Sequence, residues 1–255
     1  MKNIVEVRNV KLGEGIPKIL VSLMGANNEE VMENLAYLKT IKLDIVEWRI
    51  DHYKDVENVE KVKELLAQIR EGLGDIPLLV TFRTAKEGGE KAVTVEYYAE
   101  LKKAIAATGN ADMIDVEVFI GDDEVVKGIA DVAHEFGVKV IMSNHDFHKT
   151  PEKDELVARM CKMQQLGADI PKIAVMPLNA KDVLALLTAT NEMVCEHGET
   201  PVITMAMGTL GVVSRLAGET FGSAATFGSA KVASAPGQIS ADELDKILKL
   251  ITASK

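Results

Sequence analysis

The sequence predicts an α/β fold, a single (β/α)8 barrel, and three observations support this prediction. Short apolar runs typical of buried parallel strands alternate eight times with longer segments of helical period. The 255 residues suffice for one large barrel, and no linker composition separates the repeats. Polar residues gather directly after the apolar runs, where a barrel places its functional groups. Residues 1–255 are therefore interpreted as one barrel domain, with an open α/β sheet as the alternative.

The eight strand–helix units follow one another along the chain. Strands are predicted at 18–24, 43–49, 77–83, 113–118, 138–144, 170–176, 201–205 and 223–227. Helices are predicted from Asn27 or Asn28 onward and at 56–69, 95–107, 123–136, 151–166, 180–197, 211–217 and 241–252. Residues 4–12 alternate polar and apolar side chains, so a short N-terminal hairpin is expected to close the bottom of the barrel.

Two helix entries carry recognisable capping chemistry. Thr150 followed by Pro151 is typical of a cap with proline at the first helical position. Ser240, three residues before Glu243, is typical of a capping box. Both patterns place a helix start directly after a predicted loop, which supports the alternation of strands and helices.

Composition and charge exclude several classes of function. Lys and Arg number 29 against 39 Asp and Glu, a formal net charge of −10, and no basic stripe is present, so nucleic acid is not an expected partner. Cys161 and Cys195 both fall in predicted helices, which indicates neither a disulfide framework nor a thiolate metal site. No apolar run has the length that crosses a bilayer, and the N-terminus lacks the core of a signal peptide. A cytoplasmic protein without a membrane partner is expected.

Lys172 is the single cation in the apolar run at 170–176. Alternation places it on the same strand face as Ile170 and Ala174. Burial disfavours the ammonium form, so the pKa of Lys172 should fall, and a neutral amine can attack a carbonyl to form a Schiff base. A lysine at a strand end more often extends its head to solvent. His145, at the end of the preceding strand, favours the catalytic interpretation.

The ends of the other predicted strands are also polar, and barrel enzymes place their sites there. Each of these residues alone has a structural explanation; Glu47 and Arg49, for example, could form an ion pair in the barrel rim. Together they supply a lysine, a histidine, carboxylates and arginines, which suits Schiff-base chemistry on an anionic keto compound. The residues are Glu47, Arg49, Asp51, Arg83, Glu87, Asp115, Glu117, His145 and Lys172.

No phosphate loop, dinucleotide-binding glycine motif or HExxH helix accompanies these residues, so we expect no cofactor. Composition leaves a metal possible, because Glu, His and Asp could ligate one. A hard-metal site usually gathers several carboxylates, and Lys172 would place a cation inside it. The expectation is therefore a reaction without a metal.

Several motifs of this chain resemble those of type I 3-dehydroquinate dehydratase, the Schiff-base class of that enzyme. They follow one another in the order of that family and cover nearly the whole chain. The motifs are EWRID at 47–51, FRTAKEGG at 82–89, MSNHDF at 142–147, IPKIAVM at 170–176, GVVSRLAGE at 211–219, SAATFG at 223–228 and ASAPGQIS at 233–240.

The resemblance implies a usually dimeric barrel enzyme that eliminates water from 3-dehydroquinate to give 3-dehydroshikimate in the shikimate pathway. A small-molecule substrate and a homodimer are therefore the expected partners. The resemblance assigns Lys172 to imine formation, His145 to proton transfer, and Glu87 to holding and tuning His145. For substrate binding it implies Arg215 at the carboxylate, Ser234 and Gln238 in the last loop, and Glu47, Arg49 and Arg83 near the ring hydroxyls.

Two other functions remain as alternatives at this point. A class I aldolase or transaldolase-like lyase also uses a barrel lysine, although no clear phosphate-binding loop follows the last two strands. A barrel that only binds a small molecule is the non-enzymatic alternative, which the presence of Lys172, His145 and Glu87 together disfavours. The small residues of the segment 228–238 further predict a lid over the site.

Overall fold

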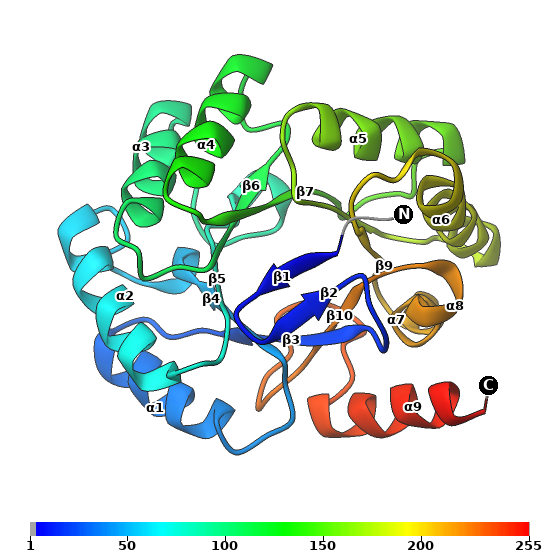
Figure 1. Cartoon of the computed structure of the whole chain (residues 1–255), viewed down its shortest axis with the longest axis horizontal. Coiled ribbons are helices and arrows are strands. Elements are labelled where there is room, and N and C mark those ends of the chain that lie inside the picture. The colour runs from blue at the N-terminus through cyan, green and yellow to red at the C-terminus, as the bar shows by residue number, and fades with distance from the viewer. Residues whose placement is uncertain (1–3, 255) are drawn as a thin grey trace.

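A computed structural model describes residues 4–254 and shows the predicted barrel. Eight parallel strands form one sheet in the order β10-β3-β4-β5-β6-β7-β8-β9, and the helices lie around its outside (Figure 1). The two edge strands approach at a bridge between Val202 and Ser223, where Ala224 N donates to Val202 O over 2.8 Å. This contact nearly closes the sheet into a barrel, so the open-sheet alternative is wrong.

The strands are slightly shorter than predicted at most positions. They are β3 (Lys18–Leu23), β4 (Ile45–Arg49), β5 (Leu78–Thr81), β6 (Met113–Glu117), β7 (Lys139–Asp146), β8 (Ile170–Val175), β9 (Ile203–Ala206) and β10 (Ala225–Gly228). The helices are α1 (Asn28–Leu38), α2 (Val59–Leu73), α3 (Val95–Ala106), α4 (Asp123–Glu135), α5 (Lys153–Gln165), α6 (Ala180–Glu192), α7 (Val212–Leu216), α8 (Gly218–Phe221) and α9 (Ala241–Ala253). None of the helices described in residues 4–254 is long and apolar enough to cross a membrane.

Most long helices begin at a polar side chain that accepts a hydrogen bond from the first turn. Such caps satisfy backbone N–H groups that have no partner within the helix. The capping residues are Asn27, Asn58, Thr94, Asp122, Asn179 and Ser240. The helix cap predicted at Ser240 is therefore confirmed, although Glu243 Oε2 contacts the Ser240 hydroxyl at 3.0 Å and not the backbone N–H of a full capping box, and Asn27 caps α1.

The cap predicted at Thr150 is wrong. Helix α5 begins only at Lys153, and Glu152 occupies its N-cap without a side-chain hydrogen bond. Thr150 Oγ1 instead donates to Met176 O at 3.1 Å, and Met176 N donates to Lys149 O at 3.3 Å. These bonds join the loops after β7 and β8, so the threonine serves the barrel mouth and not the helix.

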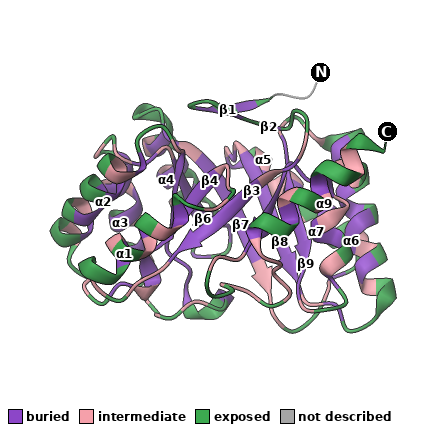
Figure 2. Ribbon diagram, turned by 90° about the horizontal axis from the view of Figure 1, so that it is seen from below, coloured by how far each residue is buried: buried purple, intermediate pink, exposed green. Residues whose placement is uncertain are grey.

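Alternation along the strands divides the buried residues into two sets. One set faces the helices, where it forms the larger apolar core. The other faces the barrel interior, which is apolar towards the N-terminal ends of the strands, with residues such as Leu20, Ile45 and Ile170. Further along the same strands the interior positions carry Glu47 and Lys172, so the interior becomes polar towards the C-terminal ends. Figure 2 shows how completely the strands are buried.

The predicted N-terminal hairpin is present and covers the bottom of the barrel (Figures 1 and 2). Its strands β1 (Val5–Val7) and β2 (Val10–Leu12) pair antiparallel, and their inward residues join the interior apolar cluster. Arg8 at the turn donates from Nε to Asp112 Oδ1 at 2.6 Å, which ties the hairpin to the sheet. The bottom of the barrel therefore serves stability, and the opposite end is left for chemistry.

Leu12→Ala should lower the free energy of unfolding by about 2–5 kcal/mol, because Leu12 is fully buried beneath the interior cluster and its loss leaves a cavity. Urea unfolding monitored by circular dichroism measures the change. The exposed neighbour Lys11→Ala is the control and should change stability by no more than about 0.5 kcal/mol. Equal stabilities of the two variants would contradict the role of the hairpin as a packed base.

Candidate active site

A cavity lies at the C-terminal ends of the strands. Its position follows from strand direction, because parallel strands bring their carboxyl ends to one rim. Every site residue that the family resemblance implies lines this cavity, from strands β4 and β8, from the ends of β5 and β7, and from α7 and the last loop, whereas Asp51, Asp115 and Glu117 lie behind it. These residues are Glu47, Arg49, Arg83, Glu87, His145, Lys172, Arg215, Ser234 and Gln238.

Lys172 lies in the middle of β8 with its side chain inside the barrel, on the face predicted from alternation. Its side chain is 4% exposed, so the amine does not reach solvent at the rim. Nζ lies 3.7 Å from Asp115 Oδ2, 3.9 Å from Glu47 Oε1 and 4.4 Å from the ring centre of Phe227. Burial lowers the pKa of Lys172, although the two carboxylates oppose this shift. A larger fraction of the amine is therefore neutral than for an exposed lysine at the same pH.

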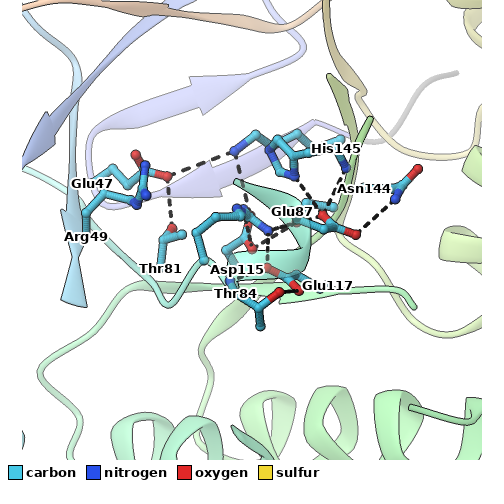
Figure 3. A network of polar contacts seen from close by, with 12 residues as sticks. Glu47, Arg49, Thr81, Thr84, Glu87, Asp115, Glu117, Asn144 and His145 are labelled. Carbon is cyan, nitrogen blue, oxygen red and sulfur yellow. Dashed lines mark hydrogen bonds and ion pairs between the residues drawn. The ribbon is translucent and has the colours of Figure 1, made fainter. Parts of the chain in front are cut away.

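His145 and Glu87 form a hydrogen-bonded pair at the cavity wall (Figure 3). Glu87 Oε2 lies 2.9 Å from His145 Nδ1 and also accepts the backbone N–H of His145 at 2.9 Å. The carboxyl group thus holds both the ring and the main chain of the residue, which fixes the ring orientation. The other ring nitrogen, Nε2, is left free of this contact.

Burial acts on both members of this pair. It lowers the pKa of His145 well below its usual value, and the cations Arg83, Lys172 and Arg49 lower it further. Burial also raises the pKa of Glu87 to about 8, although Arg83 opposes that shift. A neutral imidazole with its proton on Nδ1 leaves Nε2 as an acceptor, which is the form that a general base requires.

Arg83 and Arg49 are held by carboxylates within the protein. Arg83 binds Asp115 Oδ1 at 2.8 Å and Glu117 Oε1 at 3.0 Å, and these acids raise its pKa although burial works against the charge. Arg49 forms two hydrogen bonds of 2.8 Å with Asp51. The ion pair considered between Glu47 and Arg49 is therefore replaced by a pair with Asp51, which follows directly after the strand.

Arg215, on the short helix α7, differs from the other two arginines of the cavity. It is 1% exposed, and within residues 4–254 its Nε has no hydrogen-bond partner. Nη2 donates to Pro236 O at 3.1 Å, and the nearest partner of Nη1 is the sulfur of Met205 at 3.7 Å. Burial lowers the pKa of Arg215 to about 10. A buried guanidinium with free donors is suited to binding an anion that enters the cavity.

The last loop lies across the mouth of the cavity. Ser234 Oγ lies 2.9 Å from Ser22 Oγ, within hydrogen-bond distance, and Gly208 N donates to Pro236 O at 3.2 Å. Gly237 has a φ of 78°, and a Cβ there would lie 2.4 Å from Gly208 O. Only glycine permits this close approach of two backbones. The loop therefore seats against the neighbouring loop after β9 mainly through main-chain atoms.

Several residues of the site were not singled out from the sequence. Ser22 donates to Glu47 Oε2 at 2.6 Å, and Thr81 donates to Glu47 Oε1 at 2.9 Å, so both orient this carboxylate. Ser22 could have been found, because alternation places it on the interior face with Leu20. Phe227, beside the Lys172 amine, had no such signal, since an aromatic residue in an apolar run is typical of ordinary core. Within the described chain, no group of three or more His, Cys, Asp or Glu side chains could hold a metal ion.

Comparisons with known proteins agree with this geometry. The family model for type I 3-dehydroquinase matches residues 19–255. The 3-dehydroquinate dehydratase of Clostridium kluyveri is 69% identical over 253 residues and covers 99% of each chain. The crystal structure of type I 3-dehydroquinate dehydratase from Clostridium difficile, with covalent modified comenic acid, is 54% identical, covers 100% of both chains and has a TM-score of 0.97.

The 3-dehydroquinate dehydratase from Enterococcus faecalis is 43% identical, with a TM-score of 0.90, and the match covers 96% of this chain and 98% of that one. The match to the family model thus spans nearly the whole chain, and the solved relatives share its barrel. The chain belongs to the type I 3-dehydroquinase family and is an enzyme of the hydro-lyase class.

Proposed function

We propose that this enzyme converts 3-dehydroquinate to 3-dehydroshikimate through a Schiff base on Lys172, as a step of the shikimate pathway. The observation that carries the proposal is a buried lysine in one cavity with a His–Glu pair and an arginine whose Nε has no partner among the described residues. Elimination of water from a keto acid through an imine requires three functions: a nucleophile that attacks the ketone, a base that removes the proton from the adjacent carbon, and a cation that binds the carboxylate.

Lys172 performs the first step. Its neutral amine adds to the substrate ketone, and loss of one water molecule leaves a protonated imine. Asp115 and Glu47, both within 4 Å of Nζ, stabilise the positive charge on the imine nitrogen. The low pKa of the amine supports this step, because only the neutral form has the electron pair that attacks carbon.

His145 performs the proton transfers. It removes the proton beside the imine, and the electron pair left on carbon is delocalised into the imine as an enamine. The enamine then expels the hydroxyl group, which takes the proton from the imidazolium and leaves as water. Glu87 stabilises the imidazolium between these two steps, because its carboxyl group binds Nδ1 at 2.9 Å. Hydrolysis of the imine finally releases the product and restores the amine.

Arg215 anchors the substrate carboxylate in this proposal, since its Nε has no partner among the described residues and its Nη1 meets only the sulfur of Met205. Ser234 and Gln238 cover the substrate from the last loop, and both line the cavity. Glu47, which Ser22 and Thr81 already orient, faces the same cavity as Arg49 and Arg83 and contributes to binding of the ring hydroxyls. Arg215 thereby holds the carboxylate while Lys172 holds the ketone carbon, and these two fixed points orient the substrate ring.

The direct test is to incubate the protein with 3-dehydroquinate and to follow the ultraviolet absorbance of the conjugated enone in the product. Appearance of this chromophore at an enzymatic rate is expected. Carbon–carbon cleavage products in its place would favour the aldolase alternative, and binding without any product would favour the non-enzymatic alternative.

Borohydride reduction in the presence of 3-dehydroquinate should add the ligand mass to the peptide that contains Lys172, and Lys172→Met should abolish the adduct. Mass spectrometry of the digested protein measures this. Labelling should slow as the pH is lowered, because protonation removes the attacking electron pair.

Lys102 is a matched control within the same sample. It is also fully buried, and burial lowers its pKa to about 8, but it lies behind the sheet against Tyr98 and Val80 O. Its peptide should carry no adduct, because a low pKa without access to the cavity gives no reaction. An adduct on Lys102 with none on Lys172 would overturn the assignment.

His145→Ala should lower kcat by about 10²–10⁴-fold, the usual cost of losing a general base, and the borohydride adduct should still form. Steady-state kinetics and mass spectrometry together measure the two effects. The exposed His148, three residues further on, is the control, and His148→Ala should leave kcat unchanged. Wild-type kcat in His145→Ala would remove this residue from the mechanism.

Arg215→Lys should raise KM by roughly tenfold, because the ammonium keeps the charge but cannot form the two parallel hydrogen bonds of a guanidinium. Arg70→Lys is the control, since Arg70 binds Asp112 at the bottom of the barrel. Its KM should equal that of the wild type. An equal KM in both variants would rule out carboxylate binding by Arg215.

A further inference from the structure

A chain of hydrogen bonds runs from helix α5 to the imidazole of His145. Arg159 Nη1 donates to Asn144 Oδ1 at 2.6 Å, and Asn144 Nδ2 donates to Glu87 Oε1 at 2.9 Å. Glu87 Oε2 then contacts His145 Nδ1 at 2.9 Å; Figure 3 shows the part from Asn144 to His145. Arg159 and Asn144 do not line the cavity, so any role they have in the reaction is indirect.

Arg159, at the outer end of this hydrogen-bond series, determines which group donates and which accepts in each bond. A guanidinium has only donors, so the amide of Asn144 must turn its oxygen towards Arg159. Its nitrogen, which has only donors, must then face Glu87 Oε1, and that oxygen must accept. The backbone N–H of His145 donates to the other oxygen, Oε2. Both carboxyl oxygens of Glu87 are therefore held as acceptors, and the remaining bond to Nδ1 is best made by a proton on the imidazole.

We propose that Arg159 is a positioning residue that orients the Asn144 amide, which favours the ionised form of Glu87 and keeps the proton of His145 on Nδ1. This role rests on the proposed function of the His145–Glu87 pair as the base of the reaction. Without Arg159 the amide is free to turn over, and its oxygen would then face Glu87 Oε1. Two oxygens at that distance need a proton between them, which favours the protonated carboxyl.

The surroundings of Arg159 show a side chain that is held in place. Its side chain is 18% exposed, its Nη2 pairs with Glu155 one turn earlier on α5, and its guanidinium lies 5.6 Å from the ring centre of Phe119. Phe119 follows β6, so the arginine bridges three elements around Asn144. A surface arginine without such contacts would sample many rotamers and could not fix the amide.

Loss of this orientation should oppose catalysis, because burial already favours the neutral form of Glu87. The charged groups that face the pair from neighbouring strands and loops are Arg49, Arg83, Asp115, Glu117 and Lys172. None of them bonds to Asn144 in the described chain, so a change at position 159 leaves their contacts with the pair in place. An effect that passes through the amide is therefore separable from a general change of charge.

The test compares wild type with Arg159→Met by carbon-13 NMR of the Glu87 carboxyl group in the free protein and by the pH dependence of kcat. The pKa of Glu87 should rise by about one unit, the effect of one lost hydrogen bond to the charged form. Activity is lost as the pH falls through this pKa, so the acidic limb of kcat should move to higher pH by the same amount. At neutral pH kcat should fall about tenfold, with KM unchanged.

Arg159→Lys keeps a donor-only side chain and should restore part of the wild-type profile. Lys162→Met, which removes another cation of α5 that pairs with Asp123 and not with Asn144, should leave the profile unchanged. Asn144→Leu should raise the pKa of Glu87 as Arg159→Met does, and the double variant should show no further rise, because both changes break the same chain.

An unchanged pKa of Glu87 in Arg159→Met would overturn the proposal, and so would additive effects in the double variant. The NMR titration needs no substrate, so it decides the role of Arg159 even if 3-dehydroquinate is not turned over. Failure of the wild type to form the enone product would overturn the proposed function alone.

Discussion

The polar half of the barrel depends on the buried guanidinium of Arg83. Asp115, Glu117 and Ser143 all bind it from the two neighbouring strands, and Glu87 lies 3.5 Å away. Charges removed from water in this way are stable only when they are paired and fully hydrogen-bonded. Asp115 also faces Lys172, and Glu87 also binds His145. Burial is the main cause that lowers the pKa of Lys172 and of His145, and Arg83 lowers both further.

The sequence predicted the fold and the position of Lys172, but it did not predict the hydrogen bonds between loops. Lys172 could be placed in the interior because alternation along an apolar strand determines the face of the sheet on which each side chain lies. The carboxyl ends of the parallel strands predicted which loops gather at the site. The eight strand–helix units and the basal hairpin are confirmed by the sheet order and pairing. The cap at Thr150 failed because hydrogen bonds between loops depend on tertiary neighbours. The homodimer and the cytoplasmic location stay predictions.

The two buried lysines show why burial alone does not identify a functional residue. Lys102 and Lys172 are both withdrawn from water, and burial lowers the pKa of each. Lys102 lies outside the sheet, where the Tyr98 ring and a backbone carbonyl contact its head. Lys172 lies inside the barrel, where its amine faces Asp115, Glu47 and the cavity. Lys172 projects from an interior position of β8, whereas Lys102 projects from α3 towards the outer face of the sheet. Access to the cavity, and not burial, therefore separates the proposed nucleophile from Lys102.

The main-chain contact between Gly237 and Gly208 has a consequence for how this enzyme can diversify. The contact at Pro236 and Gly237 uses backbone atoms, so it places no demand on the exposed side chains at 231–233. Those positions are free to change in size and polarity while the cover still closes in the same register. Selection for a different ring substituent could therefore act on one short segment, with the barrel, its buried ions and its reacting groups left as they are.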